Sequence, residues 1–273
     1  MARSRSRSFW DKYRQRWEAT RSLLCIGLDS AVDKLPAAVQ CAPNPIWEFN
    51  RRIIDATCDD ACAYKPNLAF YLADGNRGCD ALHQTIQYIP DDIPVILDCK
   101  AGDIGNTMES YANAFFDGLG ADAITLNPLM GANVIEPVLT DDIRFAFALV
   151  LTSNPTAADF LQRDGLAEHI AGWLNQFPLE QIGAVVGATH PGDLRRLRQL
   201  MPGRIFLIPG IGAQGGDLAA VMKHASDRDE DPNILINSSR GIIFADRSRD
   251  FAGKAKWQAH LLREAIHDLL QIT

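Results

Sequence analysis

Eight short apolar segments recur along the chain and limit its fold more than any other feature. Each begins as an unbroken run of about strand length, rich in Val, Ile and Leu. Unbroken rather than alternating runs are typical of parallel strands that are buried on both faces. The segments are LLCIGLD (23–29), ACAYKPN (61–67), VILDCK (95–100), AITLNP (123–128), FALVLTSNP (147–155), IGAVVGATHP (182–191), IFLIPGIG (205–212) and ILINSSRG (234–241).

Segments with helical periodicity separate these runs. Two of them place four apolar side chains along one stripe of a helix: Ile46, Phe49, Ile53 and Ile54 in residues 45–60, and Trp257, Leu261, Ala265 and Leu269 in residues 254–271. Alternation of strands and helices predicts parallel crossovers, and eight repeats favour an α/β fold of the (β/α)8 TIM-barrel type. A doubly wound open sheet is the alternative. We disfavour it because the first run ends in GLDS and no GxGxxG follows.

The chain length of 273 residues suits one such barrel. We expect a single catalytic domain over residues 9–273, with an extra helix at 9–20 before the first strand, and a disordered basic tail over residues 1–8. The tail has three arginines, and the whole chain has a net charge of −7, so we expect no nucleic-acid partner. We also expect no membrane partner, because no apolar run is long enough to cross a bilayer.

We predict a cytoplasmic protein, since no apolar segment typical of a signal peptide follows the basic tail. The six cysteines form no CxxC pair, and no cluster of histidines accompanies them. Two of them, four residues apart, are expected to share one face of a helix. We predict that all six are free, buried thiols in a reducing compartment; they are Cys25, Cys41, Cys58, Cys62, Cys79 and Cys99.

Polar side chains stand near the ends of nearly all the apolar runs. In a TIM barrel these ends meet at the face that holds the active site. Polar residues at nearly every strand end therefore predict one shared polar pocket. They are Asp29, Lys65, Asp98, Lys100, Asn127, Thr152, Ser153, Asn154, Thr189, His190, Gln214, Ser239 and Arg240.

The third run has the densest charge. Asp98 and Lys100 are two residues apart, so they point to one side of a strand, and Lys65 from the second run can join them. Buried charges must pair, since each unpaired one costs several kcal/mol. A salt bridge that merely closes the barrel floor is the structural alternative. Asp103 lies past the strand, so its partner can lie on another chain, and Asn106 or Thr107 suits the N-cap of the next helix.

The seventh and eighth runs predict a phosphate site. PGIGAQGGD (209–217) is rich in glycine and opens a helix, so its backbone N–H groups can face an anion. Arg240 after the eighth strand adds a cation whose geometry suits phosphate. A phosphate anchor can supply binding energy to a distant reaction centre. There, a carboxylate would destabilise a leaving carboxylate, and an ammonium would stabilise and protonate the carbanion without a cofactor.

These motifs resemble the orotidine 5′-phosphate decarboxylase family. DCKAGDIGNT is similar to its DxKxxDIxxT signature, and the other seven strand ends resemble its longer bacterial subfamily; they are GLDS, YKPNLAFY, TLNPLMG, LTSNP, VVGATHP, PGIGAQGGD and NSSRGI. The resemblance covers nearly the whole chain. It implies decarboxylation of orotidine 5′-phosphate to UMP and CO2, the last step of UMP biosynthesis, with no metal and no organic cofactor. Position 101 is Ala, where the resemblance implies a basic residue.

The resemblance also implies roles for individual residues. Lys65, Asp98, Lys100 and Asp103 match the family's charged tetrad, in which Lys100 protonates C6 and Asp98 stresses the substrate carboxylate. In a homodimer, Asp103 and Thr107 would come from the partner subunit. The remaining substrate-binding residues are Asp29 with Lys65 for the ribose, Thr152 or Ser153 for the pyrimidine, and Gln214, Ser239 and Arg240 for the phosphate.

Two other functions remain open. Sugar-phosphate decarboxylases or aldolases of the same suprafamily share the DxKxxD strand but use Mg²⁺. They would want a further acid beside the ligand Asp, where this chain has Leu97 and Cys99. A barrel that binds nucleotides without catalysis is the second alternative, although it has no need of a costly charge cluster.

Overall fold

The computed structural model describes residues 7–189, 191–211, 216–227 and 232–270. Each of the eight apolar runs contains a strand, which confirms the prediction. The strands are β1 (Leu24–Leu28), β2 (Ala63–Pro66), β3 (Ile96–Ala101), β4 (Ala123–Leu126), β5 (Phe145–Leu151), β6 (Ile182–Val186), β7 (Phe206–Pro209) and β8 (Ile234–Ser238).

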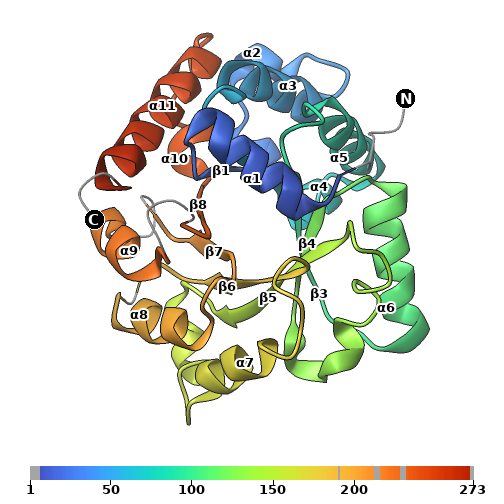
Figure 1. Ribbon diagram of the computed structural model, residues 1–273. Coiled ribbons are helices and arrows are strands. Elements are labelled where there is room, and N and C mark those ends of the chain that lie inside the picture. Colours follow the sequence, from blue (N-terminus) through green and yellow to red (C-terminus); the bar gives the residue numbers. More distant parts are fainter. Residues whose placement is uncertain (1–6, 190, 212–215, 228–231, 271–273) are drawn as a thin grey trace.

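All eight strands are parallel neighbours in the order β2-β1-β8-β7-β6-β5-β4-β3. Bridges from Tyr64 to Val95 and from Asn67 to Asp98 bring the two edge strands together. The sheet therefore closes into a TIM barrel, and the open-sheet alternative is wrong. Figure 1 looks into the barrel and shows helices arranged around its strands.

The helices cover the outside of the barrel because each buries one apolar face on the sheet. In α3, the four side chains predicted for its stripe are all buried. The described α-helices are α1 (Phe9–Thr20), α2 (Ala37–Gln40), α3 (Pro45–Thr57), α4 (Leu68–Leu72), α5 (Gly75–Tyr88), α6 (Gly105–Ala112), α7 (Leu166–Leu174), α8 (Pro191–Leu200), α9 (Leu218–Ala225), α10 (Arg240–Ile243) and α11 (Phe251–Leu270).

One crossover departs from regular alternation. Between β4 and β5 the chain forms two short 3-10 turns, η3 (Pro128–Met130) and η4 (Ala132–Val134), and no α-helix. Gly131 separates them with a φ of 79°, a left-handed conformation that interrupts a helix. The buried side chains of Val134, Ile135 and Val138 still cover this part of the sheet.

The stripe predicted on the last helix is exposed in its first half, although Leu269 at its end packs against the core. Trp257 and Leu261 on α11 are 57% and 44% exposed. The buried face is offset from them around the helix and contains Phe251, Ala255 and Ala259. Four-residue spacing therefore predicted a stripe that lies beside the buried face, in which large apolar side chains accompany the two alanines.

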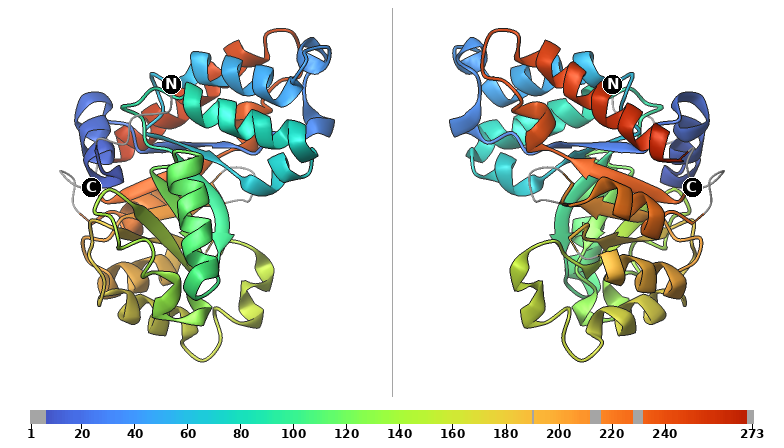
Figure 2. Two further views of the ribbon diagram at one scale, coloured as in Figure 1. Left: turned by 90° about the vertical axis from the view of Figure 1, so that its right-hand side faces the viewer. Right: turned by 90° about the vertical axis from the view of Figure 1, so that its left-hand side faces the viewer.

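The helix predicted at 9–20 is α1, and it closes the end of the barrel where the strands begin (Figure 2). Phe9 packs on Phe145 of β5 with ring centroids 4.5 Å apart. Lys12 forms a buried ion pair of 2.7 Å with Asp122, just before β4. Ser8 caps the helix by accepting a hydrogen bond from the Asp11 N–H. Residues 1–6 of the predicted tail lie outside the described residues.

The six thiols are free, as predicted, but they are not all buried. Cys25 and Cys62 are buried, whereas Cys41 and Cys79 are exposed. Cys58 and Cys62 do not share a helical face, because α3 ends at Thr57. In the described part of the chain, no helix is long and apolar enough to cross a membrane.

Candidate active site

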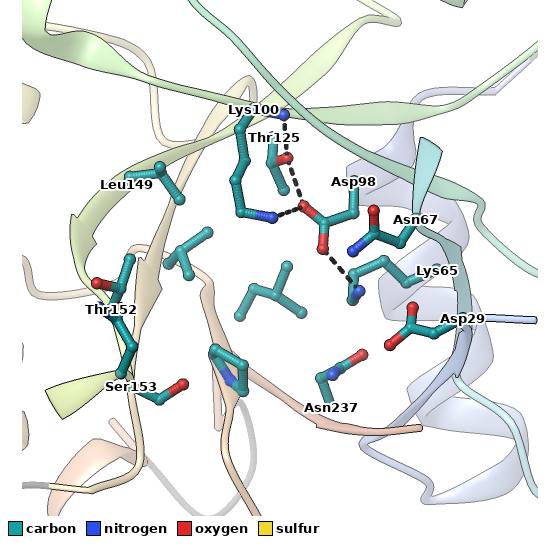
Figure 3. A pocket seen from close by; sticks show the side chains of 14 residues that line it. Asp29, Lys65, Asn67, Asp98, Lys100, Thr125, Leu149, Thr152, Ser153 and Asn237 are labelled. Atoms are coloured by element: carbon teal, nitrogen blue, oxygen red, sulfur yellow. Dashed lines mark hydrogen bonds and ion pairs between the residues drawn. The ribbon is translucent and has the colours of Figure 1, made fainter. Parts of the chain in front are cut away.

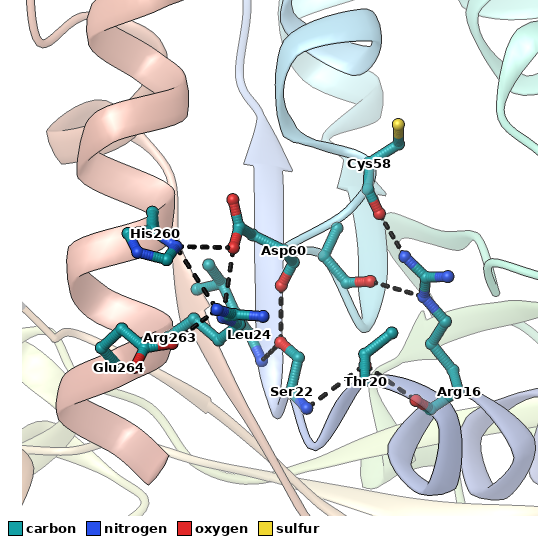
Figure 4. A network of polar contacts seen from close by, with 10 residues as sticks. Arg16, Thr20, Ser22, Leu24, Cys58, Asp60, His260, Arg263 and Glu264 are labelled. Atoms are coloured by element: carbon teal, nitrogen blue, oxygen red, sulfur yellow. Dashed lines mark hydrogen bonds and ion pairs between the residues drawn. The ribbon is translucent and has the colours of Figure 1, made fainter. Parts of the chain in front are cut away.

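A cavity of about 250 Å³ opens where the strands of the barrel end. Its polar walls come from six strand ends, and four apolar side chains line the remainder (Figure 3). The polar residues are Asp29, Lys65, Asn67, Asp98, Lys100, Thr125, Thr152, Ser153, Asn154 and Asn237, and the apolar ones are Leu149, Val185, Leu207 and Pro209. The shared polar pocket predicted from the strand ends is therefore present.

The carboxylate of Asp98 lies between two ammonium groups in this cavity. Its Oδ2 accepts a hydrogen bond of 2.9 Å from Lys65 Nζ, and its Oδ1 accepts one of 2.6 Å from Lys100 Nζ. The side chains of Lys65 and Asp98 are 5% and 12% exposed, whereas that of Lys100 is 49% exposed. The row Lys65–Asp98–Lys100 thus runs from the buried wall to the open cavity, with Lys100 at its accessible end.

Asp98 and Lys100 share a side of β3, but regular alternation of the strand is not the reason. Leu97 stands opposite Ile124 and Ala101 opposite Leu126, so β3 contains a bulge. Lys100 within it has a φ of 49°, in the left-handed region. The two side chains therefore lie on the predicted side of β3, but the bulge and the left-handed backbone at Lys100 place them there.

Ala101 ends the bulge and is buried. Its carbonyl accepts a hydrogen bond of 2.7 Å from the Asn127 N–H, which rejoins β3 to the loop after β4. A basic side chain here would need its own partner in the core, since an unpaired buried charge is costly. The small residue at this position fits the packing around it.

Asp103 and Thr107 do not reach the cavity of their own chain. Asp103 Oδ1 accepts a hydrogen bond of 2.8 Å from the Ile104 N–H, in the loop that leads to α6. The N-cap of α6 is Ile104, so the prediction that Asn106 or Thr107 caps this helix is wrong. Thr107 is exposed in the first turn instead.

The predicted phosphate end of the site is described in part. Ser239 donates its hydroxyl to the Gly27 carbonyl at 3.0 Å, which ties the end of β8 to β1. Arg240 follows as the exposed first residue of α10. Neither lines the described cavity. Gln214 and His190 lie outside the described residues.

Asn67, Thr125 and Asn237 line the cavity without having been singled out from the sequence. The buried Oδ1 atoms of Asn237 and Asp29 have no hydrogen-bond partner among the described residues. Oxygens of this kind are available to a ligand, because a buried polar atom costs free energy until it is paired. Two of these residues could have been found from the sequence, because each is a single polar residue within an apolar run. They are Thr125 in AITL and Asn237 in ILIN.

Comparison with known proteins identifies the family to which the chain belongs. Residues 22–255 match the model of the orotidine 5′-phosphate decarboxylase / HUMPS family. The chain belongs to this family. It is 43% identical to the orotidine 5′-phosphate decarboxylase of Thermomicrobium roseum over 95% of both chains, and 40% identical to that of Leptospira interrogans over 97% of this chain and 96% of that one.

Solved structures of the decarboxylase family share the fold. The OMP decarboxylase of Leishmania donovani superposes with a TM-score of 0.81 at 36% identity, covering 96% of this chain and 98% of that one. The UMP synthase of the same organism superposes with a TM-score of 0.84 at 37% identity, covering 97% of this chain and 57% of that longer one. The barrel fold is thus common to this chain and these solved structures.

Electrostatics keep Asp98 and Lys65 ionised. Burial alone would raise the pKa of Asp98, but the ammonium groups of Lys65 and Lys100 outweigh burial and hold this pKa below its usual range. Burial alone would lower the pKa of Lys65, but the carboxylates of Asp98 and Asp29 outweigh it and raise that pKa. Both groups are therefore charged throughout the neutral range.

We expect Asp98→Asn to lower the free energy of unfolding by about 3–5 kcal/mol, because the change leaves Lys65 buried without its nearest counter-charge. The folded-state pKa of Asp98 lies below its unfolded value, so its contribution is present above the unfolded pKa and lost as the pH falls through the folded one. The difference between parent and variant should stay constant from about pH 5 to 8 and shrink in stronger acid.

Urea unfolding at several pH values measures this difference. Asp92→Asn is the control, since Asp92 is half-exposed and its ion pair with Arg16 should contribute less than about 1 kcal/mol. A difference for Asp98→Asn that vanished by pH 6 would contradict the lowered pKa.

Proposed function

We propose that this pocket decarboxylates orotidine 5′-phosphate to UMP and CO2, and that Lys100 supplies the proton that replaces the carboxylate. The observation that supports it most is the row Lys65–Asp98–Lys100, whose accessible end enters a cavity at the catalytic face of the barrel. Membership in the family supports the same reaction. Curated relatives at about 40% identity have the name of this decarboxylase.

The charges suit each step of the reaction. A substrate carboxylate placed beside Asp98 is repelled, and the repulsion ends when the C6–carboxylate bond breaks and neutral CO2 leaves. The bonding electron pair stays on C6, where the ammonium of Lys100 stabilises it more strongly than it stabilises the substrate. Lys100 then transfers a proton to C6 as general acid and regains one from solvent. In these steps the protein contributes the carboxylate of Asp98 and the ammonium of Lys100.

Substrate binding is assigned to the rest of the pocket. Asp29 and Lys65 bind the ribose hydroxyls, supported by the unpartnered Asp29 Oδ1. Thr152 or Ser153 contacts the pyrimidine, since both line the cavity across from the charged row (Figure 3). Arg240 and Gln214 bind the phosphate near the ends of β7 and β8, a frequent phosphate site in this fold. Ser239 would assist through its backbone, because its hydroxyl is bonded to Gly27.

The first test removes the proton donor. Lys100→Ala should lower kcat by about 10²- to 10⁴-fold or more, while UMP still binds and the barrel still folds. Steady-state turnover and UMP titration measure the two effects separately. Lys254→Ala, an exposed lysine of α11, is the matched control and should leave both unchanged. Turnover close to that of the parent in Lys100→Ala would contradict the assigned role.

We further propose that the active unit is a homodimer in which Asp103 and Thr107 complete the partner's pocket. Support comes from Asp103, whose carboxylate is bonded to its own loop and does not line its own cavity. Large apolar side chains are exposed on and near this loop, as expected for an interface. They include Ile104, Tyr111, Leu129, Met130 and Phe160. Two of them, Leu129 and Phe160, line a mainly apolar hollow of about 210 Å³.

Mixed dimers test this arrangement. A dimer of Lys100→Ala with Asp103→Ala subunits should recover up to half of the parent activity, because one of its two sites then has both residues intact. A dimer of Lys100→Ala with Asp98→Asn should recover none, because each site lacks a residue of its own chain. Equal inactivity in both purified heterodimers would exclude a site shared between subunits.

The magnesium-dependent alternative is distinguished by chelation. Leu97 is fully buried and apolar, and the Cys99 thiol donates to the Thr125 carbonyl at 3.3 Å, so neither neighbour of Asp98 offers a further carboxylate. Among the described residues, no three His, Cys, Asp or Glu side chains gather closely enough to hold a metal. We expect turnover to persist unchanged in excess EDTA. Loss of activity that added Mg²⁺ restored would favour the alternative.

We also infer that the enzyme works in the cytoplasm. The support is its six free cysteines, two of them exposed, which persist as thiols in a reducing compartment.

A further inference from the structure

The bulge in β3 is the most unusual piece of backbone around the cavity. Three residues, Asp98, Cys99 and Lys100, stand opposite Thr125 alone, because Leu97 pairs with Ile124 and Ala101 with Leu126. Lys100 is in the left-handed region with a φ of 49°. A residue other than glycine in such a conformation costs about 1–3 kcal/mol, and it persists where the surroundings hold it in place.

Thr125 on β4 contacts all three residues of the bulge. Its Oγ1 accepts a hydrogen bond of 2.9 Å from the Lys100 backbone N–H and donates one of 2.9 Å to Asp98 Oδ1. Its carbonyl accepts the Cys99 thiol at 3.3 Å. Its side chain is buried, so water does not replace these bonds freely.

The direction of the hydroxyl is fixed by its partners. A backbone N–H can only donate, and the ionised carboxylate of Asp98 can only accept. The hydroxyl must therefore receive from Lys100 and give to Asp98. A valine at this position would have the same shape and neither bond.

We propose that Thr125 is a positioning residue that holds Asp98 and Lys100 at their working separation. This inference rests on the proposed roles of these two residues in decarboxylation. The hydroxyl bonds the main chain of the lysine and the side chain of the acid, so a single group fixes both ends of the reacting pair (Figure 3).

The need for this contact arises during turnover. Lys100 Nζ donates a hydrogen bond of 2.6 Å to Asp98 Oδ1. When the ammonium turns to C6 and gives up its proton, Oδ1 loses that partner. The bond from Thr125 remains on the same oxygen, so the carboxylate keeps its place beside the leaving group. Displacement of a reacting group by about 1 Å can cost about 100-fold in rate.

The experiment compares Thr125→Val with Thr125→Ser. The valine variant should lose about 10- to 100-fold in kcat while the dissociation constant for UMP stays near that of the parent, and the serine variant should recover most of the rate. Thr57→Val is the matched control, since it removes another buried hydroxyl, bonded to Ile53 and Tyr64 outside the cavity. It should lower the melting temperature without lowering kcat.

The outcomes separate this inference from the function on which it rests. Parent-like kcat in Thr125→Val, together with an inactive Lys100→Ala, overturns the positioning role and leaves the proposed mechanism intact. A parallel loss of UMP binding and rate that serine does not rescue also overturns it, because that pattern indicates a role in general packing. Activity in Lys100→Ala would instead remove the proposed proton donor itself.

Discussion

The carboxylate of Asp98 between two ammonium groups is the interaction on which the site depends. Two lysines and an acid in a largely buried wall would be costly if any one stood alone. The attraction between the opposite charges offsets most of the free energy that burial of each charge costs. The pKa of Asp98 is lowered and that of Lys65 is raised, so both stay ionised. The barrel supplies the rigid support, since β2, β3 and β4 fix the backbones of the participating residues through parallel hydrogen bonds.

Much of this arrangement was predictable because it follows from burial. Unbroken apolar runs identified all eight strands, and the polar residues near their ends identified most of the pocket, including Asp29, Lys65 and Asp98. The exposure of Trp257 and Leu261 on α11 was not predictable from spacing alone. Both alanines and large residues recur there, and the sequence does not say which face meets the sheet. Thr125 was missed because its hydroxyl bonds residues of the neighbouring strand β3, and spacing along one strand does not reveal a bond to another.

The loop after β3 carries Asp103 away from the cavity of its own chain. Continuous sequence places Asp103 five residues after Asp98, yet the chain turns away and directs the second carboxylate to its own loop N–H. Ile104, the residue after Asp103, exposes half of its apolar side chain. The cavity therefore holds three charges of the four-residue signature, and the fourth lies in a loop that does not line it.

A second buried Lys–Asp pair in the same barrel clarifies what the row of charges does. Lys12 and Asp122 pair at 2.7 Å where the strands begin, both almost fully buried, and Asp122 also accepts the Val95 N–H. That pair ties α1 to the sheet and faces no described cavity. The row at Asp98 differs in three respects: one lysine is half-exposed, a cavity of about 250 Å³ adjoins it, and the backbone at Lys100 is in a costly conformation. A salt bridge that only closed the barrel would need none of these. The comparison within one molecule therefore favours chemistry over structural closure for the row at Asp98.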